Sequence, residues 1–437
     1  MSRFTQLTRR AASALALSLS LFLSLLAFTS PDARAGEPVS ARGWVASWTA
    51  SPQATWGQDF ALPTGAPARL ENATVRQFVR ISLGGTDVRL VFSNAYGKTP
   101  LLIDKAFVAK VSGDGKIPSS AMEALRFGGA ETAQIAPGAS IRSDPVAMVV
   151  APLSRLAVSF HLPAPTPLST FHWDGRETAW IAPGDIALTA KMPADAERTI
   201  ARIALQAVEV AADGSAGAVA VIGDSITDGN GASVDASARW PDFLAERLAP
   251  HGLAVINAGI SGGRLLRDGM GESALARLER DVLAQPGMRA LIVLIGINDI
   301  SWPGTAFDPQ GRRPSLAAMA DGYRELVARA HARGLRVIGA TLLPFDGALR
   351  GTPLADYHDA RKDALRQDVN AWIRTSATFD ALVDFDALLR DPANPQRLRA
   401  EADSGDHLHP GDAGNRMMAE AIPLSVLLPQ DGVAKAP

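Results

Sequence analysis

The chain of 437 residues has no cysteine and almost no net charge. Without cysteine it can form no disulfide, so its stability must come from a buried core. The same absence excludes a thiol nucleophile and zinc or iron–sulfur sites with cysteine ligands. The formal net charge of −2 lacks the basic excess typical of nucleic-acid-binding proteins, so we expect no nucleic-acid partner.

The first 35 residues have the pattern of an export signal. Arg9 and Arg10 precede an apolar stretch over residues 11–28, and Ala33–Ala35 offers the small residues that a signal peptidase reads. This pattern predicts a signal peptide over residues 1–35. An uncleaved membrane anchor is the alternative, but the small residues and the polar chain after them argue against it. We expect an exported, periplasmic or extracellular protein without a stable membrane span.

The pattern of apolar and polar residues in 36–210 is typical of a β-domain. Apolar residues alternate with polar ones from Val75 to Leu83 and again from Val88 to Phe92, and Gly84–Asp87 between them is a turn signal. The pattern predicts a β-hairpin there. A similar alternation runs from Leu156 to Leu162. Short alternating strands separated by turn residues favour a β-sandwich.

From about Ala216 the pattern of apolar residues changes, and we assign residues 211–437 to a second domain. Short apolar runs alternate with helical patterns, which predicts a parallel sheet with helices on both faces. The expected strands are Ala218–Ile222, Ala254–Ile256, Ala290–Ile295, Val337–Leu342 and Ala381–Val383. The expected helices are Trp240–Leu248, Leu316–Ala332 and His358–Ile373, with another from about Arg416. Ligands of such sheets bind at the carboxyl ends of the strands.

A serine follows the first of these strands, in Gly223-Asp224-Ser225-Ile226-Thr227. A serine at the end of a strand can present its hydroxyl at the sheet edge, but it needs a base to become a nucleophile. A serine that only caps a helix is the alternative.

The sequence Asp406-His407-Leu408-His409-Pro410 supplies a base for Ser225. Asp406 precedes His409 by three residues and can hold the imidazole of His409 in the correct tautomer. His407 points elsewhere if this segment is extended. The alternatives are a metal site that uses both histidines, for which no further ligands stand out, and a helix-capping aspartate beside surface histidines.

Two further segments offer donors for an oxyanion. The glycines at the end of Asn257–Gly263 follow the second strand, and their backbone N–H groups can approach a substrate closely. Asn298, in Gly296–Asp299 after the third strand, can donate its side-chain N–H. Taken singly, both segments could be ordinary turns.

In this order, the four motifs resemble the blocks of the SGNH (GDSL) hydrolase superfamily, over about Ala216 to Leu428. The resemblance implies a flavodoxin-like, three-layer α/β domain. It also implies that Ser225 is the nucleophile, that His409 is its base and that Asp406 orients the base. The backbone N–H groups of Ser225 and Gly262 and the side chain of Asn298 would form the oxyanion hole.

Two other segments, Trp44–Gln53 and Arg264–Gly269, resemble secreted members of the superfamily that carry an N-terminal β-domain. In that subgroup an asparagine commonly follows the block glycine, whereas this chain has Gly263. The N–H donor is therefore Gly262, which we favour, or Gly263.

These features predict a secreted serine hydrolase that cleaves carboxylic esters through an acyl-enzyme on Ser225, with no cofactor and no metal. The substrate would be a small-molecule or glycan ester. A carbohydrate O-deacetylase, an acyltransferase and a binding module with a degenerate fold are the alternatives, and the intact set of five residues argues against the last. His172, Arg176 and the tryptophans of the β-domain are expected to be structural. The sequence leaves the oligomeric state open.

Overall fold

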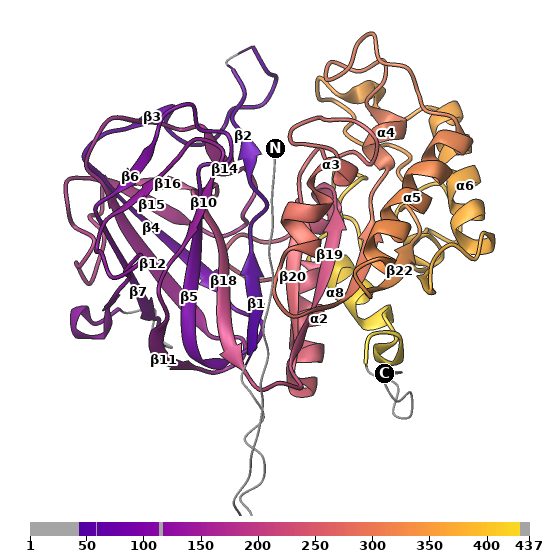
Figure 1. The fold of residues 1–437 in the computed structure, drawn as a ribbon. Helices are drawn as coiled ribbons and strands as arrows, with labels where there is room; N and C mark the ends of the chain where they lie inside the picture. The colour runs from indigo at the N-terminus through magenta and orange to yellow at the C-terminus, as the bar shows by residue number, and fades with distance from the viewer. Residues whose placement is uncertain (1–42, 58, 113–116, 429–437) are drawn as a thin grey trace, which may run out of the picture. The chain divides into compact units, whose positions relative to one another are not determined.

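The computed structural model describes residues 43–57, 59–112 and 117–428. The predicted signal peptide lies outside these ranges. All of the described residues belong to one compact unit. Among the described residues, strands are the only regular elements as far as β18 (Leu205–Ala212), apart from one short 3₁₀ turn, and strands alternate with helices after β18 (Figure 1).

Two antiparallel sheets form the β-sandwich. The first has the order β1 (Gly43–Thr49), β18 (Leu205–Ala212), β5 (Gly85–Ser93) and β10 (Ser140–Arg142), with β11 (Val146–Val150) also paired to β5. The second has the order β16 (Glu197–Thr199), β15 (Ala179–Pro183), β4 (Ala73–Arg80), β12 (Arg155–Leu162), β7 (Lys105–Lys110) and β8 (Glu123–Ala124). Val88 and Val208 of the first sheet share one buried core with Val75 and Val158 of the second, so the sheets pack face to face.

Smaller pairings surround this sandwich. They comprise β14 (Thr170–His172) between β2 (Gln53–Ala54) and β17 (Arg202–Ile203), β3 (Arg69–Leu70) with β13 (Thr166–Pro167), and β6 (Leu101–Ile103) with β9 (Ala133–Ile135). The first of these pairings matters for the site, because β2 and β14 carry residues that contact the second half of the chain.

The β-hairpin predicted around Gly84–Asp87 is wrong. Strand β4 pairs with β12 and β15, whereas β5 pairs with β18, so the chain crosses from one sheet to the other. At the crossing, the Ser82 hydroxyl donates a hydrogen bond to the Ser47 carbonyl at 2.7 Å. The apolar residues of both strands point into the same core, and a hairpin and a crossing between sheets therefore produce the same alternation.

A five-stranded parallel sheet organises the second half. Its order is β20 (Leu253–Gly259), β19 (Gly217–Gly223), β21 (Met288–Leu294), β22 (Arg336–Ala340) and β23 (Ala381–Val383). In chain order this is 2-1-3-4-5, the flavodoxin-like order, which confirms the expected fold class. Every residue of β19 is buried, as expected for a central strand covered on both faces.

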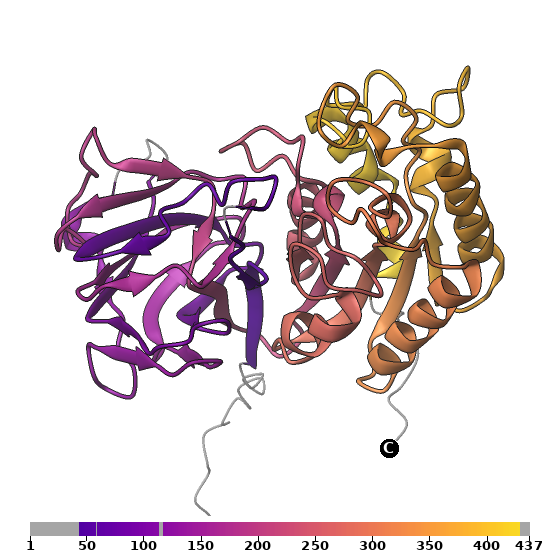
Figure 2. The same cartoon turned by 90° about the horizontal axis from the view of Figure 1, so that it is seen from above.

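The helices form two contacting groups. One contains α2 (Trp240–Leu248), α7 (Phe385–Leu389) and α8 (Asp412–Ala421), and the other contains α3 (Ala274–Leu278), α5 (Leu316–His331) and α6 (Ala360–Thr375) (Figure 2). The remaining α-helices, α1 (Ser225–Asp228) and α4 (Ile297–Ser301), each occupy about one turn directly after a strand. Helices α2, α5 and α6 lie within a few residues of their predicted ranges, whereas α8 begins four residues before the predicted Arg416.

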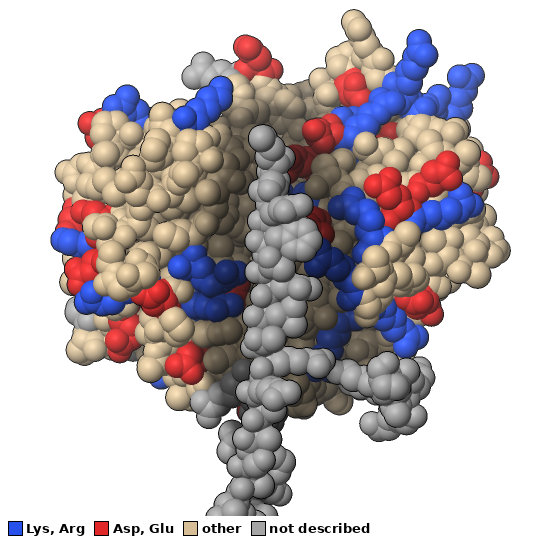
Figure 3. Space-filling model, in the orientation of Figure 1, with Lys and Arg blue, Asp and Glu red and all other residues tan. Residues whose placement is uncertain are grey.

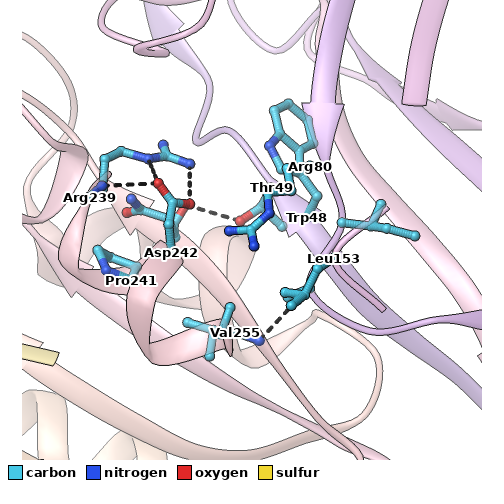
Figure 4. Close-up of a pocket in the computed structure, with 12 residues that line it drawn as sticks. Trp48, Thr49, Arg80, Leu153, Arg239, Pro241, Asp242 and Val255 are labelled. Carbon is cyan, nitrogen blue, oxygen red and sulfur yellow. Dashed lines mark hydrogen bonds and ion pairs between the residues drawn. The ribbon is translucent and has the colours of Figure 1, made fainter. Parts of the chain in front are cut away.

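Strand β1 of the sandwich contacts β20 of the parallel sheet. The Thr49 hydroxyl donates to the Asn257 carbonyl at 3.0 Å. A cavity of about 20 Å³ lies beside this contact, with Trp48 on one side and the Arg239–Asp242 ion pair on the other (Figure 4). Its volume suits about one water molecule, so it is too small for an ester substrate.

No helix in the described ranges is both long and apolar enough to cross a membrane. On the face drawn in Figure 3, the basic and acidic side chains of the described residues are interspersed over both halves of the chain.

Candidate active site

The five residues predicted from the motifs come together at the carboxyl ends of the parallel strands. Ser225 begins α1 directly after β19, Gly262 lies just beyond β20, and Asn298 lies in α4 after β21. The loop before α8 carries Asp406 and His409. All five line one cavity of about 270 Å³.

A chain of hydrogen bonds joins Asp406, His409 and Ser225. The Ser225 Oγ lies 2.8 Å from Nε2 of His409, and Nδ1 of His409 lies 2.5 Å from Oδ2 of Asp406. The carboxylate can only accept, so Nδ1 carries the ring proton and Nε2 is free to accept the serine proton. This is the arrangement that makes a serine hydroxyl nucleophilic.

The Asp406 carboxylate is held in its ionised form. Burial by itself raises its pKa, but the hydrogen bond and the charge of His409 more than offset burial. Its second oxygen, Oδ1, accepts the backbone N–H groups of Leu408 at 2.9 Å and His409 at 2.8 Å. The pKa of Asp406 therefore lies well below its usual range, and the negative charge is available to stabilise an imidazolium.

The backbone N–H groups of Ser225 and Gly262 have no acceptor among the described residues, whereas the N–H of Gly263 donates to the Ile260 carbonyl at 2.8 Å. This difference favours Gly262 over Gly263 as the candidate N–H donor. The backbone of Gly262 has φ +70°, and a Cβ there would lie 2.7 Å from atoms of Met270 and Trp302, so only glycine fits.

The side chain of Asn298 is fixed from both ends. Its Nδ2 donates to the Gly263 carbonyl at 2.9 Å, and its Oδ1 accepts the hydroxyl of Tyr357 at 2.6 Å. The amide orientation is thereby set, and the second N–H of Nδ2 remains for a substrate oxygen. Tyr357 was missed by the sequence analysis, because no local pattern connects it with a residue 59 positions earlier in the chain.

Two buried aspartates of the motifs, Asp224 and Asp299, lie next to the site residues in the chain. Asp299 accepts the backbone N–H groups of Leu265 at 2.6 Å and Leu266 at 2.9 Å, which anchors the loop after Gly262. Burial raises the pKa of Asp299 to about 6. Burial likewise raises the pKa of Asp224 to about 7, and one of its oxygens has no hydrogen-bond partner among the described residues.

His407 takes no part in the Ser225 chain. Its Nδ1 forms a short hydrogen bond with Asp403, and its side chain is 40% exposed. The segment is not extended at this point, because His407 has φ +61°. His407 and His409 thus bond to different carboxylates. Among the described residues, no group of three or more histidine, aspartate or glutamate side chains could hold a metal ion.

The rest of the cavity wall is mainly apolar. Among the described residues that line it, Asp406 is the only carboxylate, His409 is the only imidazole, and there is no arginine or lysine. Residues far apart in the sequence build the wall, among them Leu62, Trp173, Met270, Trp302, Phe307 and Leu354. The β-sandwich region contributes Leu62 and Trp173 to the wall. Phe60, which lies in the same loop as Leu62, stacks on Phe307 with ring centres 5.1 Å apart.

The solved structures to which the chain is similar include three bacterial proteins. A GDSL-like lipase from Bacteroides thetaiotaomicron is 19% identical (TM-score 0.36) and covers 48% of this chain and 87% of its own. A G-D-S-L family protein from Desulfitobacterium hafniense is 21% identical (TM-score 0.34; 47% and 96% covered), and an acetylxylan esterase from Geobacillus stearothermophilus is 24% identical (TM-score 0.35; 49% and 95% covered).

No curated protein matches the chain significantly. The sequence model of the GDSL-like lipase/acylhydrolase family matches residues 221–417. This range begins within β19 and ends within α8, and it contains all five predicted site residues. Residues 221–417 therefore constitute a GDSL-like lipase/acylhydrolase domain, and the protein is a carboxylic ester hydrolase.

Proposed function

We propose that the protein is an exported esterase that works through an acyl-enzyme on Ser225. The observation that carries this proposal is the continuous hydrogen-bond chain from Asp406 through His409 to the Ser225 hydroxyl, which ends in a cavity. A serine that only capped α1 would not require a histidine on its hydroxyl.

The reaction follows from the positions of these groups. His409 accepts the proton of Ser225 as its oxygen attacks the ester carbonyl, and Asp406 stabilises the imidazolium that results. The N–H groups of Ser225 and Gly262 and the Nδ2 of Asn298 bind the oxyanion. His409 then protonates the leaving alkoxide, and it later activates the water that releases the acid.

We propose an apolar acyl or aryl group as the part of the substrate that occupies the cavity. Trp302 and Met270 lie beside Gly262, next to the position of the scissile carbonyl. Most of the exposed wall surface is apolar, although polar side chains also contribute to it, whereas a sugar would need many hydrogen-bond partners.

A chain-length series of p-nitrophenyl esters tests this preference. From acetate to octanoate, kcat/KM should rise by up to about four-fold for each methylene that is buried, at about 0.8 kcal/mol each. Ser225→Ala is the control for hydrolysis that does not depend on the site. Faster release of acetate from an acetylated glycan than from any of these esters would favour the O-deacetylase, and ester products with added alcohols would favour the acyltransferase.

Export is a separate part of the proposal and rests on the sequence of residues 1–35. N-terminal sequencing of the protein from its producing cells should give a start at or near Gly36. A chain that still carries Met1 would contradict the predicted cleavage.

A further inference from the structure

His172 belongs to β14 in the first half of the chain, but its ring reaches the helix that carries Ser225. Its Nε2 lies 2.9 Å from Oδ1 of Asp228, the last residue of α1. Its Nδ1 lies 3.1 Å from the carbonyl oxygen of Ser51. Both side chains of the pair are almost completely buried, at 5% and 1% exposure.

The pair is charged and held in a single orientation. The carbonyl of Ser51 and the carboxylate of Asp228 are both acceptors, so each ring nitrogen of His172 carries a proton. Burial by itself lowers the pKa of His172, but Asp228 and the carbonyl of Ser51 raise it above its usual value. A second buried carboxyl, Asp174, faces the same pair and is 3.5 Å from the Arg176 guanidinium.

Asp228 also binds the loop after β20. Its second oxygen, Oδ2, accepts both the backbone N–H of Ser261 at 2.8 Å and the Ser261 hydroxyl at 2.9 Å. The N–H of Gly262 belongs to the peptide unit that begins at the Ser261 carbonyl. Because Ser261 is held at two atoms, the direction in which the Gly262 N–H points is fixed.

We propose that His172 is a positioning residue for ester hydrolysis, which holds the Gly262 N–H at the oxyanion through Asp228 and Ser261. The proposal rests on the esterase function inferred above. It assigns the strands beside the β-sandwich a part in transition-state binding, because β14 supplies the cation that orients Asp228.

A purely structural contact between the two halves of the chain is the rival explanation, and the chain offers a matched control for it. His161 is equally buried, and its ring nitrogens lie 2.9 Å from Asp104 and 3.0 Å from Asn72. All three of these residues lie within the sandwich region. Loss of His161 should therefore lower stability without altering the oxyanion donors.

The experiment compares His172→Gln with His161→Gln in the full chain. We expect His172→Gln to lower kcat by between about 10- and 100-fold with little change in KM, as for a small misplacement of a catalytic group. The inhibition constant of butaneboronic acid, which forms a tetrahedral anion on the serine, should rise by a similar factor. His161→Gln should keep the kcat and the boronate affinity of the wild type at a comparable loss in Tm.

Asp228→Asn provides a second test should His172→Gln fail to fold. The amide has one acceptor oxygen, which can serve either His172 or Ser261 but not both, so kcat and boronate affinity should again fall together. Unchanged kcat and boronate affinity in either folded variant would overturn the proposal while Ser225→Ala remains inactive. Full activity of Ser225→Ala would instead overturn the esterase mechanism itself.

Discussion

The segment Asp403–His409 contains two aspartate–histidine pairs with different surroundings. In both pairs Nδ1 of the histidine bonds to a carboxylate, and in both the carboxylate also accepts backbone N–H groups of its own loop. The His409 ring is 7% exposed and continues to Ser225, whereas the His407 ring is 40% exposed. The comparison teaches that a carboxylate on an imidazole is not by itself the mark of a catalytic base. We propose that the group on the opposite nitrogen, which for His409 is the Ser225 hydroxyl, makes the difference.

Removal of Ser225 or of His409 should have the largest effect. Ser225→Ala and His409→Ala should each lower kcat by a factor of about 10⁵ or more, because neither group has a task without the other. The double variant should be scarcely worse than either single one. Steady-state kinetics on p-nitrophenyl butyrate measures all three, and His407→Ala, expected within about two-fold of wild type, is the control. A crippled His407→Ala beside an active His409→Ala would reverse the assignment.

Loss of Asp406 should lower kcat far more than loss of Asp403, just as loss of His409 should lower it far more than loss of His407. Asp406→Ala should lower kcat by about 10³–10⁴, less than His409→Ala, because Asp406 orients the base and does not itself transfer the proton. Asp403→Ala removes a carboxylate from the same loop and should have a far smaller effect on kcat. Equal losses in the two variants would show that the loop, and not the pairing with His409, controls activity.

The oxyanion donor comes next in size. Asn298→Ala should lower kcat by about 10²–10³ with little change in KM, since the donor acts mainly in the transition state. Tyr357→Phe removes only the hydroxyl that orients the amide, so its loss should be smaller. Unchanged kcat in Asn298→Ala would mean that the amide does not reach the oxyanion.

Asp224 extends the comparison to a carboxyl without a cationic partner. Its ionisation is expected to affect the stability of the fold. Its folded pKa is raised from 3.8 to about 7, so the folded protein binds the proton more tightly and its stability falls as the pH rises through this range. Asp406, whose pKa is lowered, instead loses its stabilising contribution as the pH falls.

Asp224→Asn removes the ionisation and can keep the hydrogen bond to the Ile226 N–H. The free energy of unfolding of the variant relative to wild type should therefore increase between about pH 4 and pH 7, by a few kcal/mol at most, about 1.4 kcal/mol for each unit of pKa. Urea denaturation at the two pH values measures this change. A difference independent of pH would show that Asp224 stays ionised.

The sequence predicted features that local patterns encode. The strands of the parallel sheet were found because each is an apolar run between helical patterns, and Ser225, Asn298 and His409 were found because their motifs follow strands or form short spacings. The crossing between β4 and β5 was mistaken for a hairpin, because alternation reports which residues face the core and not which strand is the neighbour. The contacts of Tyr357 with Asn298 and of His172 with Asp228 were not predicted, because the partners lie 59 and 56 positions apart in the chain.

Detection of the acyl-enzyme is the most direct test of the central claim that Ser225 is the nucleophile activated by His409. The protein is mixed with p-nitrophenyl butyrate, quenched with acid within milliseconds, digested and analysed by mass spectrometry. The account predicts one butyryl group on the peptide that contains Ser225, and none in His409→Ala over the same time. A butyryl group on another residue, or full labelling of Ser225 in His409→Ala, would contradict it.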